Sequence, residues 1–241
     1  MAVGLNTVET SRPRPLPRIA GLAALVVMLA VAFGCSASAF RPVLQCQAKM
    51  QLARWEWLQA QELRREGKMQ LARRHWLGSE EHLEEAAAAD PLSAEPWKQL
   101  ASQSFARWVE SGDREAFDQF ETSMKRALRL SPKSAATRRM CGDWYWQAYV
   151  ETGRQDQEMV RKAVSAYRQA VDLYPNLGHI RASLALALRA AGDQPEFEQE
   201  AAVALHLDRI AQEAQHTDKV LDDRVRNELR QGLSRNIPRD D

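Results

Sequence analysis

Apolar residues recur at helical spacing along most of the chain after residue 42, in copies of one pattern. The clearest copy ends at Pro175, and in it Ala163, Tyr167 and Ala170 are spaced four and three positions apart. This spacing places the three side chains on one face of a helix, which the proline ends. The same ending recurs at residues 86–91 and 127–132 and, without its proline, at 204–208. Four copies predict an all-α chain built from repeated pairs of antiparallel helices.

Polar turns divide this part of the chain into units. Glycine occurs in four short stretches, each of which separates two helical segments: 67, 111–113, 152–153 and 192–193. Glycine is common just after a helix C-terminus. We therefore expect an atypical first hairpin over residues 43–91, three further hairpins over 92–215, a polar capping helix over 216–233 and a disordered tail over 234–241. A polar outer face on the terminal unit is typical of repeat arrays.

The pattern also predicts which side chains face a neighbouring helix. In the opening helix of the first hairpin, Ala48, Leu52 and Trp55 recur at helical spacing and are expected to pack against the return helix. Gly142 lies in the middle of a predicted helix, where glycine costs about 1 kcal/mol relative to alanine. We expect that a neighbouring helix packs closely against Gly142.

Residues 1–40 differ in composition from the repeats. Residues 1–18 are polar and carry Arg12, Arg14 and Arg18, whereas residues 19–40 contain no charged residue. An uncharged run of this length predicts a membrane-directed helix, because a helix needs about 20 apolar residues to cross the hydrocarbon layer. Three interpretations are open: a retained transmembrane span, a cleaved signal peptide with its small-x-small site at residues 37–39, and a lipoprotein signal with Cys35 as the modified residue.

The flanking charges predict the orientation of this segment. Three basic residues precede it and three follow it within about 15 positions, so the positive-inside rule gives nearly equal weight to both orientations. A short basic N-terminus before a first span usually stays in the cytoplasm. We therefore expect a single span, with the repeats on the extracytoplasmic side of the membrane.

The repeats resemble the tetratricopeptide repeat family. That family combines an aromatic residue, a leucine beside a small residue and a tyrosine with a later alanine, aromatic residue and proline. The pattern is matched by Trp97, Leu100 and Ala101 in the second unit, by Gly142, Tyr145, Ala163, Tyr167, Ala170 and Pro175 in the third, and by Leu184, Ala185 and Ala204 in the fourth. The alanines at 86, 127, 170 and 204 are separated by 41, 43 and 34 residues, and the family period is about 34. The resemblance implies a solenoid of antiparallel helical hairpins in which units two and three are lengthened.

Three segments carry a second resemblance. Residues 86–101, 142–146 and 218–223 look like the helical-repeat tails of bacterial O-antigen ligase and polymerase proteins, although the chain lacks the many spans of such enzymes. This resemblance implies an accessory or tail domain in the synthesis or ligation of cell-envelope polysaccharide.

Composition argues against several classes of function. The chain has 241 residues and a formal net charge of +1, so nucleic acid is not expected as a partner. Its histidines form neither an HExxH motif nor a paired spacing with cysteine, and no phosphate loop or Gly-x-Ser-x-Gly motif occurs. We therefore expect no metal site, no cofactor and no enzymatic activity. Cys141 is interpreted as a small buried hydrophobic residue, with pairing to Cys46 as an alternative in an oxidising compartment.

The resemblance to tetratricopeptide repeats also implies a binding groove on the first helices of successive units. Nine residues occupy the groove positions of the family: Lys98, Ser102, Phe105, Arg139, Asp143, Trp146, Ala182, Leu186 and Arg189. The three cations among them resemble the basic lining with which some tetratricopeptide proteins hold an acidic peptide end. We therefore expect a membrane-anchored or exported scaffold that binds another protein. A glycan-binding module that uses residues 144–146 is a further alternative.

Overall fold

The computed structural model describes residues 18–234 as α-helices joined by short turns. In chain order these helices are α1 (Arg18–Arg65), α2 (Met69–Ala89), α3 (Glu95–Ser111), α4 (Arg114–Leu130), α5 (Ala135–Glu151), α6 (Gln157–Leu173), α7 (Gly178–Ala191), α8 (Gln194–Glu213) and α9 (Asp223–Ser234). No strand occurs in this part of the chain, so the fold class is all-α, as predicted. Residues 1–17 of the expected basic segment and residues 235–241 of the expected tail lie outside the described residues.

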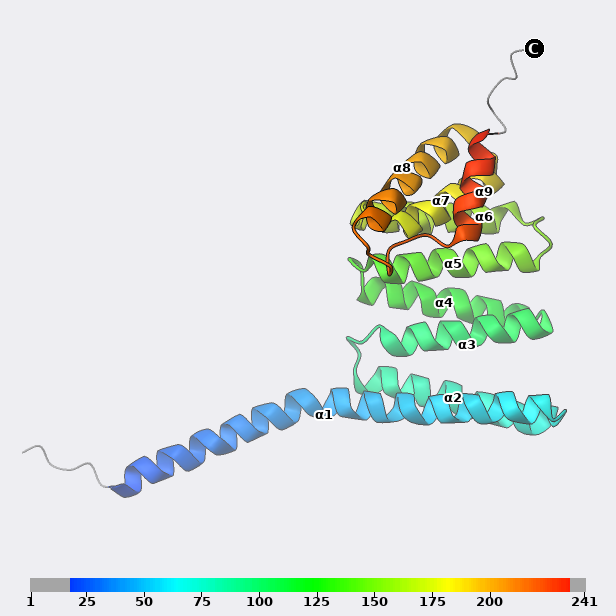
Figure 1. Ribbon diagram of the computed structural model, residues 1–241. Helices are drawn as coiled ribbons and strands as arrows, with labels where there is room; N and C mark the ends of the chain where they lie inside the picture. Colours follow the sequence, from blue (N-terminus) through cyan, green and yellow to red (C-terminus); the bar gives the residue numbers. More distant parts are fainter. Residues whose placement is uncertain (1–17, 235–241) are drawn as a thin grey trace, which may run out of the picture.

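Successive helices form antiparallel hairpins that are stacked on one another (Figure 1). Within each hairpin, α1 and α2, α3 and α4, α5 and α6, and α7 and α8 pack extensively. Consecutive hairpins meet through α2 and α3, α4 and α5, and α6 and α7, and α9 packs against α7 and α8 at the end of the stack. Because each hairpin packs on its neighbours in the chain, the described part is a tetratricopeptide-like solenoid.

Side-chain caps and left-handed glycines mark the ends of the helices. Asp113 and Asp156 accept hydrogen bonds from backbone N–H groups in the first turns of α4 and α6, and Ser134 does so for α5. Gly112 and Gly192 follow α3 and α7 with φ angles of 69° and 81°, a conformation that glycine adopts without a steric penalty. These turns lie at positions where the sequence predicts them.

α1 is a single helix of 48 residues. It joins two segments that the sequence analysis treats separately, the uncharged run 19–40 and the opening helix of the first hairpin. Pro42 lies inside α1, where it removes a backbone hydrogen bond and favours a bend, and Figure 1 shows that α1 is bent. A proline at this position therefore bends the helix without ending it.

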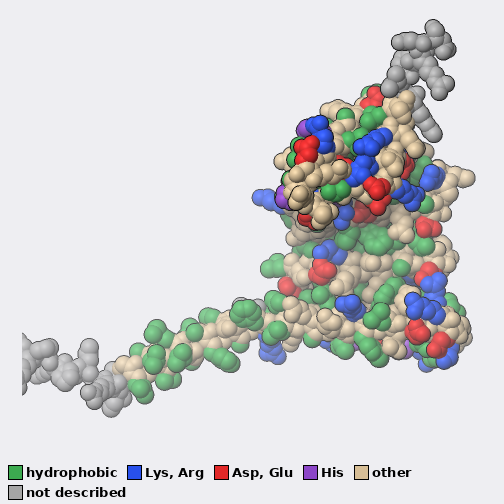
Figure 2. Space-filling model, in the orientation of Figure 1, with side chains coloured by type: hydrophobic (Ala, Val, Ile, Leu, Met, Phe, Trp, Pro, Cys, Tyr) green, Lys and Arg blue, Asp and Glu red, His purple; other side chains and the backbone are tan. Residues whose placement is uncertain are grey.

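The N-terminal half of α1 has no protein packed around it. Every side chain described between residues 21 and 38 is exposed, and apolar atoms cover this part of the helix on the visible face (Figure 2). Among the described residues, α1 is the one helix long and apolar enough to cross a membrane. By length and composition, both a membrane span and a signal sequence fit it.

The face of α1 that packs against α2 differs from the predicted one. Ala53 and Ala60 are fully buried, whereas Leu52 and Trp55 of the predicted stripe are 46% and 53% exposed. Ala48 is exposed as well. The alanines let the two backbones approach closely, which leaves the larger side chains on the outer surface. The predicted face was wrong by about one residue, or roughly 100° of rotation about the helix axis.

Gly142 lies against a neighbouring helix, as predicted. A Cβ atom at this position would lie 2.6 Å from both Cδ1 and Cε1 of Tyr167 in α6. The Tyr167 ring is buried, and its hydroxyl donates a 2.9 Å hydrogen bond to Asp143. The helices α5 and α6 can approach this closely because residue 142 has no side chain.

Candidate functional site

The first helices α3, α5 and α7 carry the nine residues predicted to line a binding groove. Phe105 and Ala182 are each 1% exposed, which makes them core residues and corrects their place in the predicted groove. Phe105 packs on Trp144, with 4.7 Å between ring centroids. The other seven are exposed or half-buried, namely Lys98, Ser102, Arg139, Asp143, Trp146, Leu186 and Arg189. Their binding of a partner stays a prediction.

Carboxylates of the chain itself engage the three cations of this face. The partners are Glu95 for Lys98, Asp143 for Arg139 and Glu228 for Arg189. Arg189 is held most firmly, because it donates a 2.5 Å hydrogen bond to the Glu228 carboxylate and a 3.1 Å bond to the Glu228 backbone carbonyl in α9. A paired cation attracts an acidic ligand less than a free one does, since the partner charge opposes it.

Trp146 is a half-buried aromatic residue on this face. Its ring lies 5.5 Å from that of Tyr149, and these two residues border a hollow of about 170 Å³ with Leu186 and Arg189. Pockets that hold small molecules usually measure about 300–1,000 Å³. This hollow fits one inserted side chain better than a whole ligand.

The neighbours of Trp146 are turned toward the core. Trp144 packs on Phe105, and Tyr145 meets Phe120 edge to face with 5.7 Å between ring centroids. All three residues 144–146 are half-buried, and together they leave only a small platform for a sugar.

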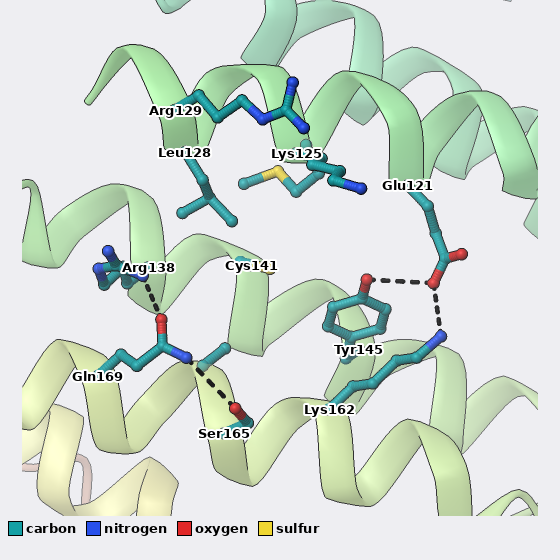
Figure 3. Close-up of a pocket in the computed structure, with 12 residues that line it drawn as sticks. Glu121, Lys125, Leu128, Arg129, Arg138, Cys141, Tyr145, Lys162, Ser165 and Gln169 are labelled. Carbon is teal, nitrogen blue, oxygen red and sulfur yellow. Dashed lines mark hydrogen bonds and ion pairs between the residues drawn. The ribbon is translucent and has the colours of Figure 1, made fainter. Parts of the chain in front are cut away.

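A larger cleft is lined by α4, α5 and α6, and we call it the α4–α6 cleft (Figure 3). Its volume is about 530 Å³. Four of its lining residues are apolar or weakly polar and four are cations: Met124, Leu128, Cys141 and Ala166 form the first group, and Lys125, Arg129, Arg138 and Lys162 the second. Glu121 is the carboxylate that lines it. The cleft thus combines an apolar lining with an excess of positive charge.

The cleft exists because α4 and α5 touch at few points. Near the N-terminal end of α4, the rings of Phe117 and Phe120 fill the space between the helices, and Phe120 reaches Tyr145 of α5. Toward the C-terminal end of α4, Leu128 shares the cleft with Cys141, whose side chain is much smaller. The space that aromatic rings fill at one end is left open at the other.

One side of the cleft is a closed hydrogen-bonded network. The Tyr145 hydroxyl and the Lys162 ammonium group donate to the same oxygen of Glu121, at 3.1 and 2.7 Å. Burial raises the pKa of Tyr145 above its ordinary value, so the hydroxyl stays protonated. Burial alone would lower the pKa of Lys162, but hydrogen bonds to Glu121 and Glu158 outweigh it and raise that pKa. The network therefore holds an ammonium and a carboxylate that neutralise each other.

The opposite side carries charge that the described residues do not neutralise. The side chains of Lys125 and Arg129 make no hydrogen bond or ion pair within residues 18–234, and Figure 3 shows both extending from α4 at the edge of the cleft. Arg138 donates to Gln169 and, at 3.0 Å, to the carbonyl oxygen of Pro132. These hydrogen bonds fix its position and leave its positive charge in place.

The sequence analysis did not identify this cleft. Lys125, Arg129 and Arg138 do not stand out among the basic residues of the sequence. The sequence signal that could have revealed the cleft is Lys125 and Arg129, one helical turn apart on α4, together with the small inward-facing Cys141 on α5. That signal requires knowing which faces of α4 and α5 oppose each other.

The described residues include no cluster of three or more histidine, cysteine or acidic side chains that could hold a metal ion. All three cysteines are free thiols. Burial raises the pKa of Cys141 to about 12, so its thiol is protonated at neutral pH and behaves as a small apolar group.

Comparison with known proteins yields matches among solved structures. No protein-family model matches the chain, and no curated protein matches it. The chain is similar to the crystal structure of TTC0263, a thermophilic TPR protein in Thermus thermophilus, at 19% sequence identity and a TM-score of 0.45; the match covers 76% of this chain and 99% of that chain. By the contacts between their helices, residues 18–234 form a tetratricopeptide-like solenoid.

Proposed function

We propose that the protein is a membrane-anchored scaffold that binds another protein through its helical repeats, with the repeats on the extracytoplasmic side. The observation that supports binding most directly is the α4–α6 cleft, where exposed cations without partners border an apolar lining. Complementary charge steers association and selects partners. A scaffold with such a cleft needs no catalytic group of its own.

The partner segment best suited to this cleft is an amphipathic helix with carboxylates beside its apolar face. Lys125 and Arg129 lie one turn apart on α4, about 6 Å along the axis, which matches carboxylates one turn apart on a second helix. The half-buried Leu128 supplies apolar contact for a leucine-like side chain, whereas Met124 is 1% exposed and belongs to the core. Helices that lay an apolar face into a groove are a common mode of peptide recognition.

The anchoring half of the proposal is supported by α1. Its uncharged N-terminal half has an exposed apolar surface, and about 20 such residues suffice to span a bilayer. We expect the full-length chain to remain in membranes after carbonate extraction and a variant without residues 19–40 to be soluble. Reporter fusions at the two ends would give the orientation. Recovery of the full-length chain in the soluble fraction would contradict anchoring.

Photocrosslinking tests the binding half. A photoreactive amino acid in place of Leu128 is expected to crosslink a defined protein in cells, and one in place of Trp146 is not. Against the purified partner, Lys125→Glu with Arg129→Glu should lower affinity by about tenfold, which is about 1.4 kcal/mol, and should reduce its salt dependence.

Arg161→Glu is the matched control, because Arg161 is an exposed cation of α6 that does not line the cleft. It reverses a charge of the same sign and should leave the affinity unchanged. Because it reverses one charge where the double variant reverses two, a loss of about half the binding free energy lost in the double variant would mean that net charge alone governs binding. Crosslinks from residue 146 and none from residue 128 would move the binding surface to the first-helix face.

A further inference from the structure

The turns of the solenoid form two edges of different composition. The turns that connect successive hairpins, which we call the inter-repeat edge, are residues 90–94, 131–134 and 174–177. The turns within hairpins are residues 66–68, 112–113, 152–156 and 192–193, and they contain no large apolar residue. The inter-repeat edge instead exposes Leu92 (84%) and Tyr174 (55%), and it carries the exposed Lys133 between them in sequence.

The inter-repeat edge lies on the side of the solenoid from which the N-terminal half of α1 departs (Figure 1). The turns within hairpins lie on the opposite side. If the N-terminal half of α1 enters a bilayer, the inter-repeat edge is therefore the edge that faces the bilayer. The hairpin turns then face away from it.

The turn at 90–94 is close to the end of the uncharged run. Cys46 of α1 is buried, and it lies close enough to Asp90 and Ser93 for both to affect the pKa of its thiol. Cys46 lies six residues after Phe40, which is about 9 Å along a helix. The polar headgroup layer is roughly 5–8 Å thick on each side of the hydrocarbon core. The first turn of the inter-repeat edge thus lies at the outer boundary of the headgroup layer.

Local hydrogen bonds hold these turns in shape. The Leu92 backbone N–H donates to the Asp90 carboxylate at 3.2 Å, and the Leu92 side chain is exposed. In the 174–177 turn, the guanidinium group of Arg181 donates to the carbonyl oxygen of Pro175 at 2.7 Å. A braced turn keeps its apolar side chain exposed at a constant position, whereas a loose loop would fold it back.

We infer that the inter-repeat edge rests on the headgroup layer of the bilayer that α1 enters, with Leu92 and Tyr174 inserted at the lipid interface. Tyrosine favours this interface because its ring is apolar and its hydroxyl is polar, and Lys133 is placed to meet lipid phosphates. The stack of hairpins then runs along the membrane surface. This inference rests on the proposed anchoring through α1.

Fluorophore labelling of the full chain tests the inference. The exposed Cys35 is replaced by Cys35→Ala, while the two buried cysteines stay. An environment-sensitive fluorophore is then attached in turn to Leu92→Cys, Tyr174→Cys and two controls near the hairpin turns, Gln155→Cys and Ala191→Cys. Each protein is reconstituted in vesicles of equal parts phosphatidylcholine and phosphatidylglycerol. Spin-labelled lipid should quench the labels at 92 and 174 several-fold more than those at 155 and 191.

Vesicle flotation separates failure of the inference from failure of the anchoring. Equal quenching at all four positions, in protein that floats with the vesicles, would overturn the inference and leave the anchoring intact. Protein that does not float would overturn both. The labels at 92 and 174 could also report an apolar environment in detergent, without vesicles, and do so more strongly as protein concentration rises. That result would assign the edge to a second copy of the chain and overturn the lipid contact.

Discussion

Gly142→Ala is expected to destabilise the solenoid although it adds a better helix former. The new Cβ would lie 2.6 Å from two ring atoms of Tyr167, whereas carbon atoms pack at about 3.5–4.0 Å. The ring would have to move by about 1 Å. It is buried, and its hydroxyl is held by a 2.9 Å hydrogen bond to Asp143, so that movement also strains or breaks the bond.

The magnitude follows from three contributions. Overpacking costs about 1–3 kcal/mol, and loss of the hydrogen bond costs about 1 kcal/mol. Replacing a mid-helix glycine by alanine returns about 1 kcal/mol. We therefore expect the free energy of unfolding to fall by about 1–3 kcal/mol. For a chain of this size each kcal/mol corresponds to about 2–4 °C in Tm.

Thermal unfolding of the full chain in detergent, followed by circular dichroism, measures this change. Gly78→Ala is the matched control, because Gly78 is also mid-helix and its added Cβ would meet the Glu56 side chain at an ordinary 3.4 Å. It should raise Tm by the helix-propensity gain. Tyr167→Leu should make Gly142→Ala less costly in a double-mutant cycle, because the smaller side chain leaves room for the methyl group. A rise in Tm for Gly142→Ala as large as that for Gly78→Ala would refute the close approach of α5 and α6.

Three further outcomes are expected. Burial alone would raise the pKa of Asp208, but hydrogen bonds from Arg226 and the Leu221 N–H outweigh it and lower that pKa. The docking of α9 should therefore be complete above about pH 4, which is the ordinary pKa of an aspartate. It should weaken as the pH falls through the lowered pKa of Asp208. Hydrogen exchange of α9 against pH measures this, and Asp208→Asn should remove the acid-dependent step. Cys141 should react with alkylating reagents at neutral pH far more slowly than an exposed thiol, since burial raises its pKa to about 12, and mass spectrometry would reveal fast labelling if α5 opened. Trp146→Ala should leave affinity at the α4–α6 cleft unchanged, whereas a loss of about 2 kcal/mol in a titration would indicate that the partner occupies the first-helix face.

The repeat endings were predictable because they combine two independent signals. Ala163, Tyr167 and Ala170 are all buried, and the helix that carries them ends before Pro175. Gly142 was predictable for a similar reason, since a glycine that weakens a helix needs a packing partner to compensate. In both cases the signal is local, and one helix with its nearest neighbour suffices to interpret it.

The packed face of α1 was not predictable in the same way. Its alanines and its larger apolar residues both recur at helical spacing, so the period alone fits a stripe through Ala53 and Ala60 as well as one through Leu52 and Trp55. The choice depends on how closely α2 approaches, which is a property of the pair of helices. The same limit applies to Arg189, because its carboxylate partner Glu228 lies on another helix, α9, and had to be located in space.

The aromatic cluster at residues 144–146 acts mainly through the spacing of helices. Trp144 on Phe105 and Tyr145 on Phe120 fill one end of the junction between units two and three, and α4 and α5 touch little beyond those rings. Between units three and four the helices α6 and α7 pack closely, where small residues such as Ala182 are buried. Bulky aromatic rings therefore leave a cleft open between α4 and α5, at the junction of units two and three. Small residues instead close the junction of units three and four, between α6 and α7. The rings that suggested a glycan platform from the sequence thus set the spacing of the helices around the α4–α6 cleft, and Lys125 and Arg129 of α4 with Arg138 of α5 give that cleft its charge.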